Sequence, residues 1–268
     1  MKLFAEQAPK LAIPAVEALS PGAVTHLIVT CCTGFSAPGL DLQLVDYLGL
    51  SPSVERTTIG FMGCYAAING LKLARHIVRS EPASRVLMIN LELCTLHFKE
   101  STDLEQILAF FLFADGCAAS LISAEPEGLA IDGFYSARLP DTACLIQWNI
   151  GDSGFDMHLS GHVPGAIREL LPSEAERMVG GPTDLWAIHP GGRSILDAVQ
   201  HAVQIPADGL KASREVLREF GNMSSATVMF VLKRLMEGAH PGETGCAMSF
   251  GPGIMAETMR FHVPGGPG

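Results

Sequence analysis

The chain has 268 residues, which is enough for one large domain or two ordinary ones with a buried core. Hydrophobic residues make up 48% of it and charged residues only 17%, a composition that excludes a disordered chain. The net charge of −10 excludes a general electrostatic attraction to nucleic acid or to an anionic membrane, so we expect neither as a partner. No apolar run reaches the length of about 18 residues that a membrane span requires.

Strand-like apolar runs alternate along the chain with segments of helical periodicity, a pattern typical of the α/β class. The first strands are predicted at residues 25–31, 56–61, 85–93 and 114–123, and the first helices at 40–48, 63–80 and 103–111. Later strands are predicted at 129–135, 145–150, 155–159, 185–188, 245–250 and 254–262, and later helices at 164–178, 193–203, 211–220 and 224–236. The change of composition at 124–128 predicts two domains, 1–124 and 125–268.

The seven cysteines are scattered through apolar segments and include no Cys-x-x-Cys pair. An odd number with this spacing indicates reduced thiols in the cytoplasm, not a disulfide framework or a zinc site. Glu6 and Gln7 lie where a secretory signal would need an apolar core. We therefore expect a cytoplasmic protein without a metal site.

Cys64 follows a predicted strand and a glycine turn, and it lies at the start of the predicted helix 63–80. The N-terminus of a helix directs unpaired N–H groups and a positive potential at such a residue, which favours a thiolate over a thiol. This is a position for a nucleophile. A small buried hydrophobic residue is the commoner role of a single cysteine, and the spacing alone leaves that alternative open.

Two more polar residues lie at the ends of predicted elements. His189 follows the strand 185–188, and polar residues at the carboxyl end of a strand in an α/β sheet face the crevice where ligands bind. Asn222 precedes the helix 224–236, where capping is the ordinary role of an asparagine. Because Cys64, His189 and Asn222 all lie at element ends on separate segments, they are candidates for one catalytic group.

Several short segments along almost the whole chain match one family in order. They include Gly63-Cys64, Leu-Phe-Ala-Asp-Gly at 112–116, Trp-Ala-Ile-His-Pro-Gly-Gly at 186–192, Gly-Asn-Met-Ser-Ser at 221–225 and Phe-Gly-Pro-Gly at 250–253. With these segments the chain resembles the type III polyketide synthases, the chalcone and stilbene synthase family. The resemblance implies a thiolase-like α/β fold with αβαβα layers and two related halves, the first of which is N-terminally incomplete.

The resemblance also implies the roles of the site residues. Cys64 is expected to carry the acyl group, with His189 and Asn222 as catalytic partners and Phe113 as a gatekeeper. The other cavity and substrate-binding residues implied are Cys32, His97, Trp148, Met157, Ser224, Gly251, Pro252 and Gly253. The expected substrates are acyl-CoA and malonyl-CoA, with no further cofactor, and the expected assembly is a homodimer.

These residue types suit decarboxylative condensation. A thiolate of Cys64 paired with a His189 imidazolium is expected to attack an acyl-CoA thioester. Loss of CO₂ from malonyl-CoA gives an enolate whose oxygen needs hydrogen-bond donors, which His189 and Asn222 can supply. Attack of this enolate on the acylated cysteine extends the chain by two carbons, towards alkylpyrone, alkylresorcinol or chalcone-like products.

Four positions depart from the plant enzymes. Met157 stands where those enzymes have a second gatekeeping phenylalanine, Trp148 replaces a small residue, and Cys32 and His97 replace threonines. In these respects the chain resembles bacterial members that extend fatty acyl starters. Family members also carry basic residues for the CoA phosphates in a segment before the first matched residue, so we expect the chain as given to be a weak catalyst.

Three alternatives remain at this point. An initiating β-ketoacyl-carrier-protein synthase would use the same Cys-His-Asn group on the same fold, although Phe113 and the segment 250–253 favour the polyketide synthases. A papain-like cysteine hydrolase would use the same residue types on a different fold. A catalytically impaired, truncated homologue could serve as an interaction module.

Overall fold

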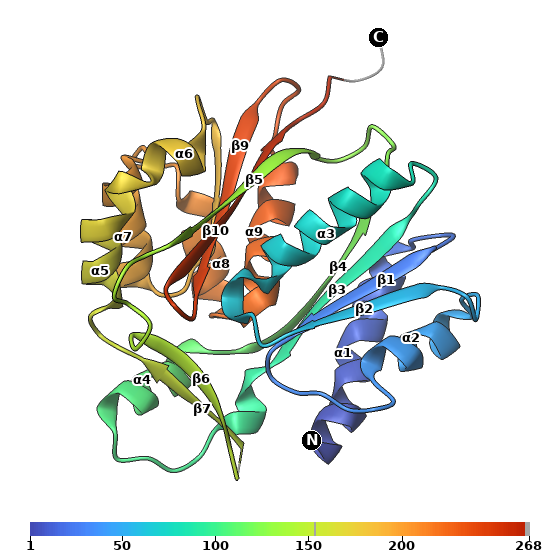
Figure 1. Ribbon diagram of the computed structural model, residues 1–268, viewed down its shortest axis with the longest axis horizontal. Helices are drawn as coiled ribbons and strands as arrows, with labels where there is room; N and C mark the ends of the chain where they lie inside the picture. Colours follow the sequence, from blue (N-terminus) through green and yellow to red (C-terminus); the bar gives the residue numbers. More distant parts are fainter. Residues whose placement is uncertain (153, 266–268) are drawn as a thin grey trace.

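Two four-stranded sheets form the centre of the structure, a computed structural model that describes residues 1–152 and 154–265 (Figure 1). The N-terminal sheet has the strand order β2-β1-β3-β4. Its strands are β1 (His26–Cys31), β2 (Glu55–Gly60), β3 (Val86–Leu93) and β4 (Asp115–Ile122). β1 is parallel to β2 and β3, whereas β4 is antiparallel to β3.

The C-terminal sheet has the order β5-β10-β9-β8. Its strands are β5 (Ala130–Arg138), β8 (Leu185–Ile188), β9 (Thr244–Gly251) and β10 (Met255–His262). β8 and β9 are parallel and β10 is antiparallel to β9, which repeats the arrangement of β1, β3 and β4. The two halves thus have related topologies, as the resemblance implied.

Helices separate and cover the sheets. The helices of the first half are α1 (Lys2–Leu19), α2 (Leu40–Leu48), α3 (Ala66–Ser80) and α4 (Leu104–Leu112). Those of the second half are α5 (Val163–Leu170), α6 (Ala175–Val179), α7 (Arg193–Val203), α8 (Lys211–Phe220) and α9 (Thr227–Met236). α3 and α9 share one hydrophobic core with both sheets, while α1 and α2 cover the outer face of one sheet and α5 and α7 that of the other. The result is the expected αβαβα layering.

This burial on two faces explains the unbroken apolar runs of the central strands. In β1, Leu27 and Val29 face α1 and α2, while Ile28 faces α3. Successive side chains of a strand point to opposite faces, so a strand with helices on both sides needs apolar residues at every position.

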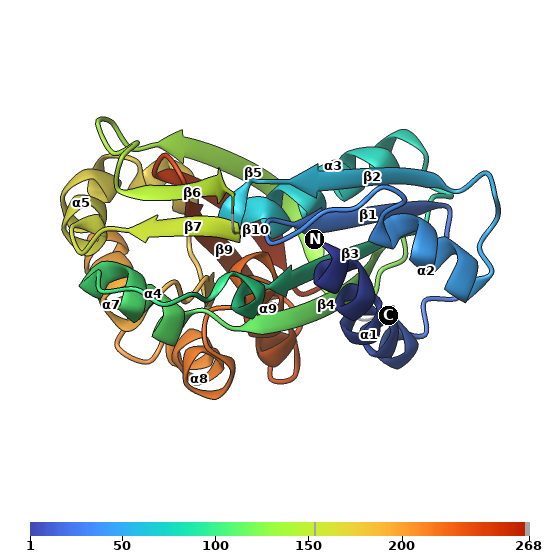
Figure 2. The ribbon, with the colours of Figure 1, turned by 90° about the horizontal axis from the view of Figure 1, so that it is seen from below.

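A two-stranded hairpin lies apart from both sheets. It consists of β6 (Ile146–Gly151) and β7 (Gly154–Leu159), in which Trp148 pairs directly with Met157. The hairpin packs beside α4 at one end of the molecule (Figures 1 and 2). Within the described ranges, no helix combines the length and hydrophobicity that a membrane span needs.

The predicted strands are confirmed to within three residues at each end, but two helical predictions were wrong. No element was expected before residue 25, yet α1 is present although Pro9 and Pro14 lie inside it. Its Phe4, Ala8 and Ala12 follow each other at four-residue spacing and are buried against the N-terminal sheet, and this packing outweighs the cost of the prolines.

The second error concerns residues 164–178, which were predicted as one helix. They form α5, a 3₁₀ turn at Leu171–Ser173 and α6. Pro172 lacks the backbone N–H that a continuous helix would need. Two other predicted helices, 63–80 and 224–236, begin with 3₁₀ turns at Gly63–Tyr65 and Ser224–Ala226.

Candidate active site

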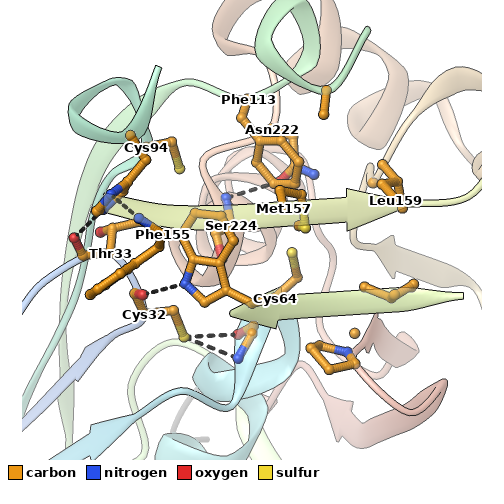
Figure 3. Close-up of a pocket in the computed structure, with 18 of the residues that line it drawn as sticks. Cys32, Thr33, Cys64, Cys94, Phe113, Phe155, Met157, Leu159, Asn222 and Ser224 are labelled. Atoms are coloured by element: carbon orange, nitrogen blue, oxygen red, sulfur yellow. Dashed lines mark hydrogen bonds between the residues drawn. The ribbon is translucent and has the colours of Figure 1, made fainter. Parts of the chain in front are cut away.

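A largely apolar cavity lies where both halves of the molecule meet the β6–β7 hairpin, with an empty volume of about 840 Å³ that includes space open to solvent (Figure 3). The expected site residues that line it are Cys32, Cys64, His97, Phe113, Trp148, Met157, His189, Asn222, Ser224, Gly251 and Pro252. Gly253 does not line it and lies in the turn between β9 and β10 with a φ of 113°. The fold therefore brings residues from distant segments into one cavity.

Cys64 sits in a tight turn between β2 and α3. Gly63 has a φ of 74°, in the left-handed region that favours glycine, and a Cβ there would lie 2.5 Å from Pro252 Cδ. Gly251 also allows a close approach, because a Cβ on it would lie 2.7 Å from Cδ1 of Tyr65, the residue after Cys64. The segment Phe-Gly-Pro-Gly thus supports the nucleophile turn from the other half of the molecule.

The protonation of Cys64 differs from the expected thiolate. Burial raises the pKa of the Cys64 thiol to about 12, although hydrogen bonds from the side chains of Ser224 and Asn222 act in the opposite direction. The positive end of a helix and two donors do not compensate for the loss of hydration. In this structure Cys64 is a neutral thiol, and it needs a base before it can attack a thioester.

His189 lies directly after β8, and its backbone N–H donates to the carbonyl oxygen of Met248 at 2.8 Å. Its side chain is buried, and burial lowers the pKa of the imidazole to about 3. Neither ring nitrogen has a hydrogen-bond partner among the described residues. Unpaired buried polar atoms are costly, so an imidazole with both nitrogens free and facing a cavity is suited to exchange protons and hydrogen bonds with a ligand.

Asn222 is held by its backbone and by one end of its amide. Its N–H donates to the carbonyl of Leu112 and its carbonyl accepts from Ala114, both at 2.9 Å, which places it beside Phe113. Its Oδ1 accepts from the N–H of Ser224 at 2.9 Å (Figure 3). The capping role uses Oδ1 and leaves Nδ2 for the cavity, so the two interpretations of Asn222 are compatible.

An aromatic cluster forms one wall of the cavity. His97 stacks on Phe155 with a centroid distance of 4.4 Å, and Trp148 meets both rings edge-on at 5.3 and 5.7 Å. The Phe155 N–H donates to His97 Nδ1 at 3.0 Å, so His97 Nε2 carries the hydrogen that it shares with the Thr33 carbonyl at 2.6 Å. Trp148 Nε1 donates to the carbonyl of Cys32 at 2.7 Å. We call these three rings the aromatic wall.

Sequence reasoning missed Glu92, which is fully buried near the end of β3. Its carboxyl accepts from the Cys32 N–H and the Thr33 hydroxyl, both at 2.9 Å, and from the Ser225 hydroxyl at 2.6 Å. Burial raises the pKa of Glu92, while these hydrogen bonds lower it. An acidic residue inside an otherwise buried apolar strand was the available signal.

Comparisons with known proteins agree with this architecture. Family models for "Chalcone and stilbene synthases" match residues 6–126 with the N-terminal domain and 134–264 with the C-terminal domain. "Alpha-pyrone synthesis polyketide synthase-like Pks18" of Mycobacterium tuberculosis is 34% identical over 285 residues, covering 98% of this chain and 72% of the relative. The protein of the same name from Mycobacterium bovis gives the same values.

Two solved structures are similar. The C-terminal type III polyketide synthase domain of Steely1, a type I/III hybrid from Dictyostelium, has a TM-score of 0.91 at 27% identity and covers 97% of this chain and 78% of that one. PKS-I from the brown alga Ectocarpus siliculosus has a TM-score of 0.84 at 34% identity, with 90% and 69% covered. These matches contradict the papain-like alternative and do not favour the carrier-protein synthase. The chain belongs to the chalcone and stilbene synthase family and is a type III polyketide synthase, an acyltransferase with a thiolase-like fold.

Proposed function

We propose that the protein loads an acyl group from acyl-CoA onto Cys64 and extends it with malonyl-CoA to give an alkylpyrone. The observation that carries the proposal is the buried imidazole of His189, which lies in the same cavity as Cys64 and Asn222 and has no hydrogen-bond partner in the part of the chain that the structure describes. A neutral thiol and a neutral imidazole that line the same cavity are a starting state for general base catalysis.

In the loading step, His189 takes the proton of Cys64 as the sulfur attacks the thioester carbonyl. The C–S bond to CoA then breaks, and the CoA thiolate leaves with the proton from His189. Acyl-Cys64 and a neutral imidazole remain. No cofactor is required, because the thioester itself supplies the activation.

In the extension step, malonyl-CoA loses CO₂, and the electron pair of the broken C–C bond forms an enolate. Hydrogen bonds from His189 Nε2 and Asn222 Nδ2 stabilise the enolate oxygen. The enolate carbon attacks the carbonyl on Cys64, a new C–C bond forms and the C–S bond breaks, which gives a β-ketoacyl-CoA and a Cys64 thiolate that takes a proton from solvent. After reloading on Cys64 and a second extension, the enol oxygen of the triketide attacks the CoA thioester carbonyl, and CoA leaves with the proton as the pyrone ring closes. Phe113 lies beside Asn222 and keeps water away from the enolate.

The apolar lining supports a hydrocarbon starter. Phe98, Phe110 and Leu159 line the cavity together with the aromatic wall, and none of them offers a hydrogen bond to a substituted starter. The name of the mycobacterial relative refers to alpha-pyrone synthesis, and we propose this product class here. Trp148 and Met157 are proposed to set the length of starter that fits.

We also propose that the enzyme is a cytoplasmic homodimer. The seven cysteines are free, which suits a reducing compartment. Phe35 and Phe61 are exposed aromatic residues that both contact Phe155 near the open edge of β2. Light scattering should give a dimer mass, and Phe35→Asp should shift it towards the monomer; a monomeric wild type would contradict this part.

Intact and peptide mass spectrometry test the loading proposal. After incubation with a C12 acyl-CoA, wild-type protein should gain one acyl group on Cys64, and Cys64→Ala should gain none. Addition of malonyl-CoA should then release CO₂ and a pyrone. Acylation that persists in Cys64→Ala, or hydrolysis without condensation, would contradict the proposal.

A further inference from the structure

Cys32, which follows β1, makes a hydrogen bond with each of its three polar groups. Its N–H donates to Glu92, and its carbonyl accepts from Trp148 Nε1 at 2.7 Å. Its sulfur accepts from the backbone N–H of Gly63 at 3.0 Å and lies 3.8 Å from the Gly63 carbonyl, the contacts drawn as dashed lines from Cys32 in Figure 3. One residue therefore connects a wall of the cavity with the turn that presents Cys64.

The turn at Gly63 has little freedom on its other side. Pro252 packs so closely on Gly63 that no side chain fits there. The first N–H groups of a helical turn have no partner inside the turn, and the sulfur of Cys32 supplies one for Gly63. Gly63 is thus fixed between a sulfur atom of one half and a proline of the other, and Cys64 is the next residue.

The chemistry of Cys32 suits a supporting role. It is buried, and burial raises the pKa of its thiol well above the ordinary value, so it stays protonated at neutral pH. A neutral thiol can accept from the Gly63 N–H and donate to the Gly63 carbonyl, but it is a poor nucleophile. It does not compete with a Cys64 that has a base available.

We propose that Cys32 is a positioning residue for the loading of Cys64: its sulfur fixes the Gly63–Cys64 turn, and its carbonyl couples that turn to Trp148. The inference rests on the proposed function of Cys64. Cys32 then has a role beyond lining the cavity. A change in the aromatic wall should alter the rate at which Cys64 is acylated.

The test uses an isosteric pair. Cys32→Thr keeps an acceptor for the Gly63 N–H, whereas Cys32→Val has nearly the same shape without one. We expect Cys32→Thr to be acylated at Cys64 within about threefold of the wild-type rate, and Cys32→Val about tenfold more slowly, which is the scale of one hydrogen bond. The matched pair Cys117→Thr and Cys117→Val, on the half-buried strand β4, should show no such difference.

A second measurement tests the coupling. Trp148→Phe keeps a ring but loses the Nε1 donor to Cys32. In a double-mutant cycle with Cys32→Val, the loading rate of the double variant should exceed the rate expected from independent effects by about threefold or more. Independent effects would overturn the coupling, and equal rates for Cys32→Thr and Cys32→Val at equal Tm would overturn the positioning role. An acyl group found on Cys32 itself would also overturn it.

The two proposals can fail separately. The rate at which iodoacetamide alkylates Cys64, followed on that peptide by mass spectrometry, measures how well the turn exposes and orients the Cys64 sulfur. This measurement needs no acyl-CoA. If wild-type Cys64 is never acylated, the proposed function fails, while a Thr–Val difference in alkylation would still support the positioning role. If Cys64 is acylated but Cys32→Val behaves as Cys32→Thr in both assays, only the inference about Cys32 fails.

Discussion

Cys64 and His189 are both held in their uncharged forms by burial. The pKa of Cys64 is raised to about 12 and that of His189 is lowered to about 3, so neither group titrates near neutrality. The nucleophile is therefore activated by proton transfer at the moment of attack and not by a standing negative charge. Burial also keeps water from the acylated cysteine, which is useful for an enzyme that must condense and not hydrolyse.

This arrangement predicts an unusual pH profile. Alkylation of wild-type Cys64 should change less than about threefold between pH 6 and 9, because His189 stays an uncharged base throughout that range. In His189→Gln the rate should rise about tenfold per pH unit, because only the small thiolate fraction below a pKa of about 12 reacts. Stopped-flow alkylation with peptide mapping measures both, and a tenfold-per-unit rise in the wild type would contradict the role of His189.

Asn222 offers a second test at the residue scale. Asn222→Asp keeps an oxygen for the Ser224 N–H but loses the Nδ2 donor, while Asn222→Ala loses both. Malonyl-CoA decarboxylation should fall about 10²–10³-fold in both variants, since that is the cost of one missing oxyanion donor. Loading of Cys64 should fall much less, and only Asn222→Ala should show a lower Tm. Equal losses in decarboxylation and loading would indicate a purely structural cap.

At the scale of elements, the β6–β7 hairpin carries the side chains that shape the cavity. Trp148 and Met157 are directly paired across its two strands, and the Trp148 ring makes edge-on contacts with His97 and Phe155. The hairpin belongs to neither sheet, so its side chains can vary without disturbing the layers that hold the catalytic residues. Its main proposed role is therefore to select the starter, with Trp148 also bound to the carbonyl of Cys32, while the catalytic residues lie at the ends of sheet strands and helices.

Substitutions in the hairpin should change selectivity more than chemistry, and their effect on chemistry should be confined to the loading step that Trp148 influences through Cys32. Trp148→Gly should open space at the wall and shift the preferred starter towards bulkier acyl-CoA substrates, with kcat for the preferred substrate within about tenfold of wild type. Competition assays with acyl-CoA mixtures measure the shift. A loss of stability of about 3–5 kcal/mol from the void is a separate effect, which thermal unfolding detects. Unchanged starter preference in a folded variant would refute the proposed role.

The α1 helix illustrates how packing overrides local sequence preference. Its two internal prolines argue against a helix, but the buried residues at four-residue spacing cover the outer face of the N-terminal sheet. The four-residue spacing is a property of the sequence, but only the sheet beneath it shows that this side of the segment is buried. In the predicted helix 164–178 the proline decided the outcome instead, because the chain turns there between α5 and α6.

At the scale of the whole molecule, the catalytic group joins the two halves. Cys64 belongs to the first half, and His189 and Asn222 belong to the second, with the shared core of α3 and α9 between the sheets. The Pro252 contact with Gly63 and the Asn222 backbone bonds to Leu112 and Ala114, at the end of α4, both cross between halves. The stability of the molecule and the geometry of the site therefore depend on the same interface.

Global stability should depend on pH through His189. Burial lowers the pKa of His189 from its ordinary 6.5 to about 3, so between these values the unfolded chain binds a proton that the folded one does not. The free energy of unfolding should then fall as pH drops below about 6.5, by up to about 1.4 kcal/mol per unit from this group. The contribution of Glu92 to the pH dependence has the opposite sign. Because the pKa of Glu92 is raised in the fold, the free energy of unfolding falls as pH rises above the pKa of this carboxyl in the unfolded chain. Urea unfolding at pH 4.5–7.5 gives the free energy of unfolding at each pH. This free energy should depend less steeply on pH in His189→Gln than in the wild type. An unchanged pH dependence would contradict the burial of a neutral imidazole.

The sequence by itself determined the α/β class, the order of nearly all strands and helices, and the family, because periodicity and short motifs are local properties of the chain. It also indicated Cys64, His189 and Asn222, since each lies at the end of an element where a side chain can reach a crevice.

Only the tertiary structure decided how these residues are charged and supported. The pKa values of Cys64 and His189 depend on burial by segments far away in the chain, and burial outweighs the helix N-terminus that the sequence showed. The partners of Glu92 lie about 60 and 133 residues away in sequence, and the contact of Cys32 with Gly63 spans 31. Such long-range pairings produce no periodic pattern in the sequence. Many buried strand ends could supply a hydrogen-bonding partner, and only the packing of the layers decides which two residues meet.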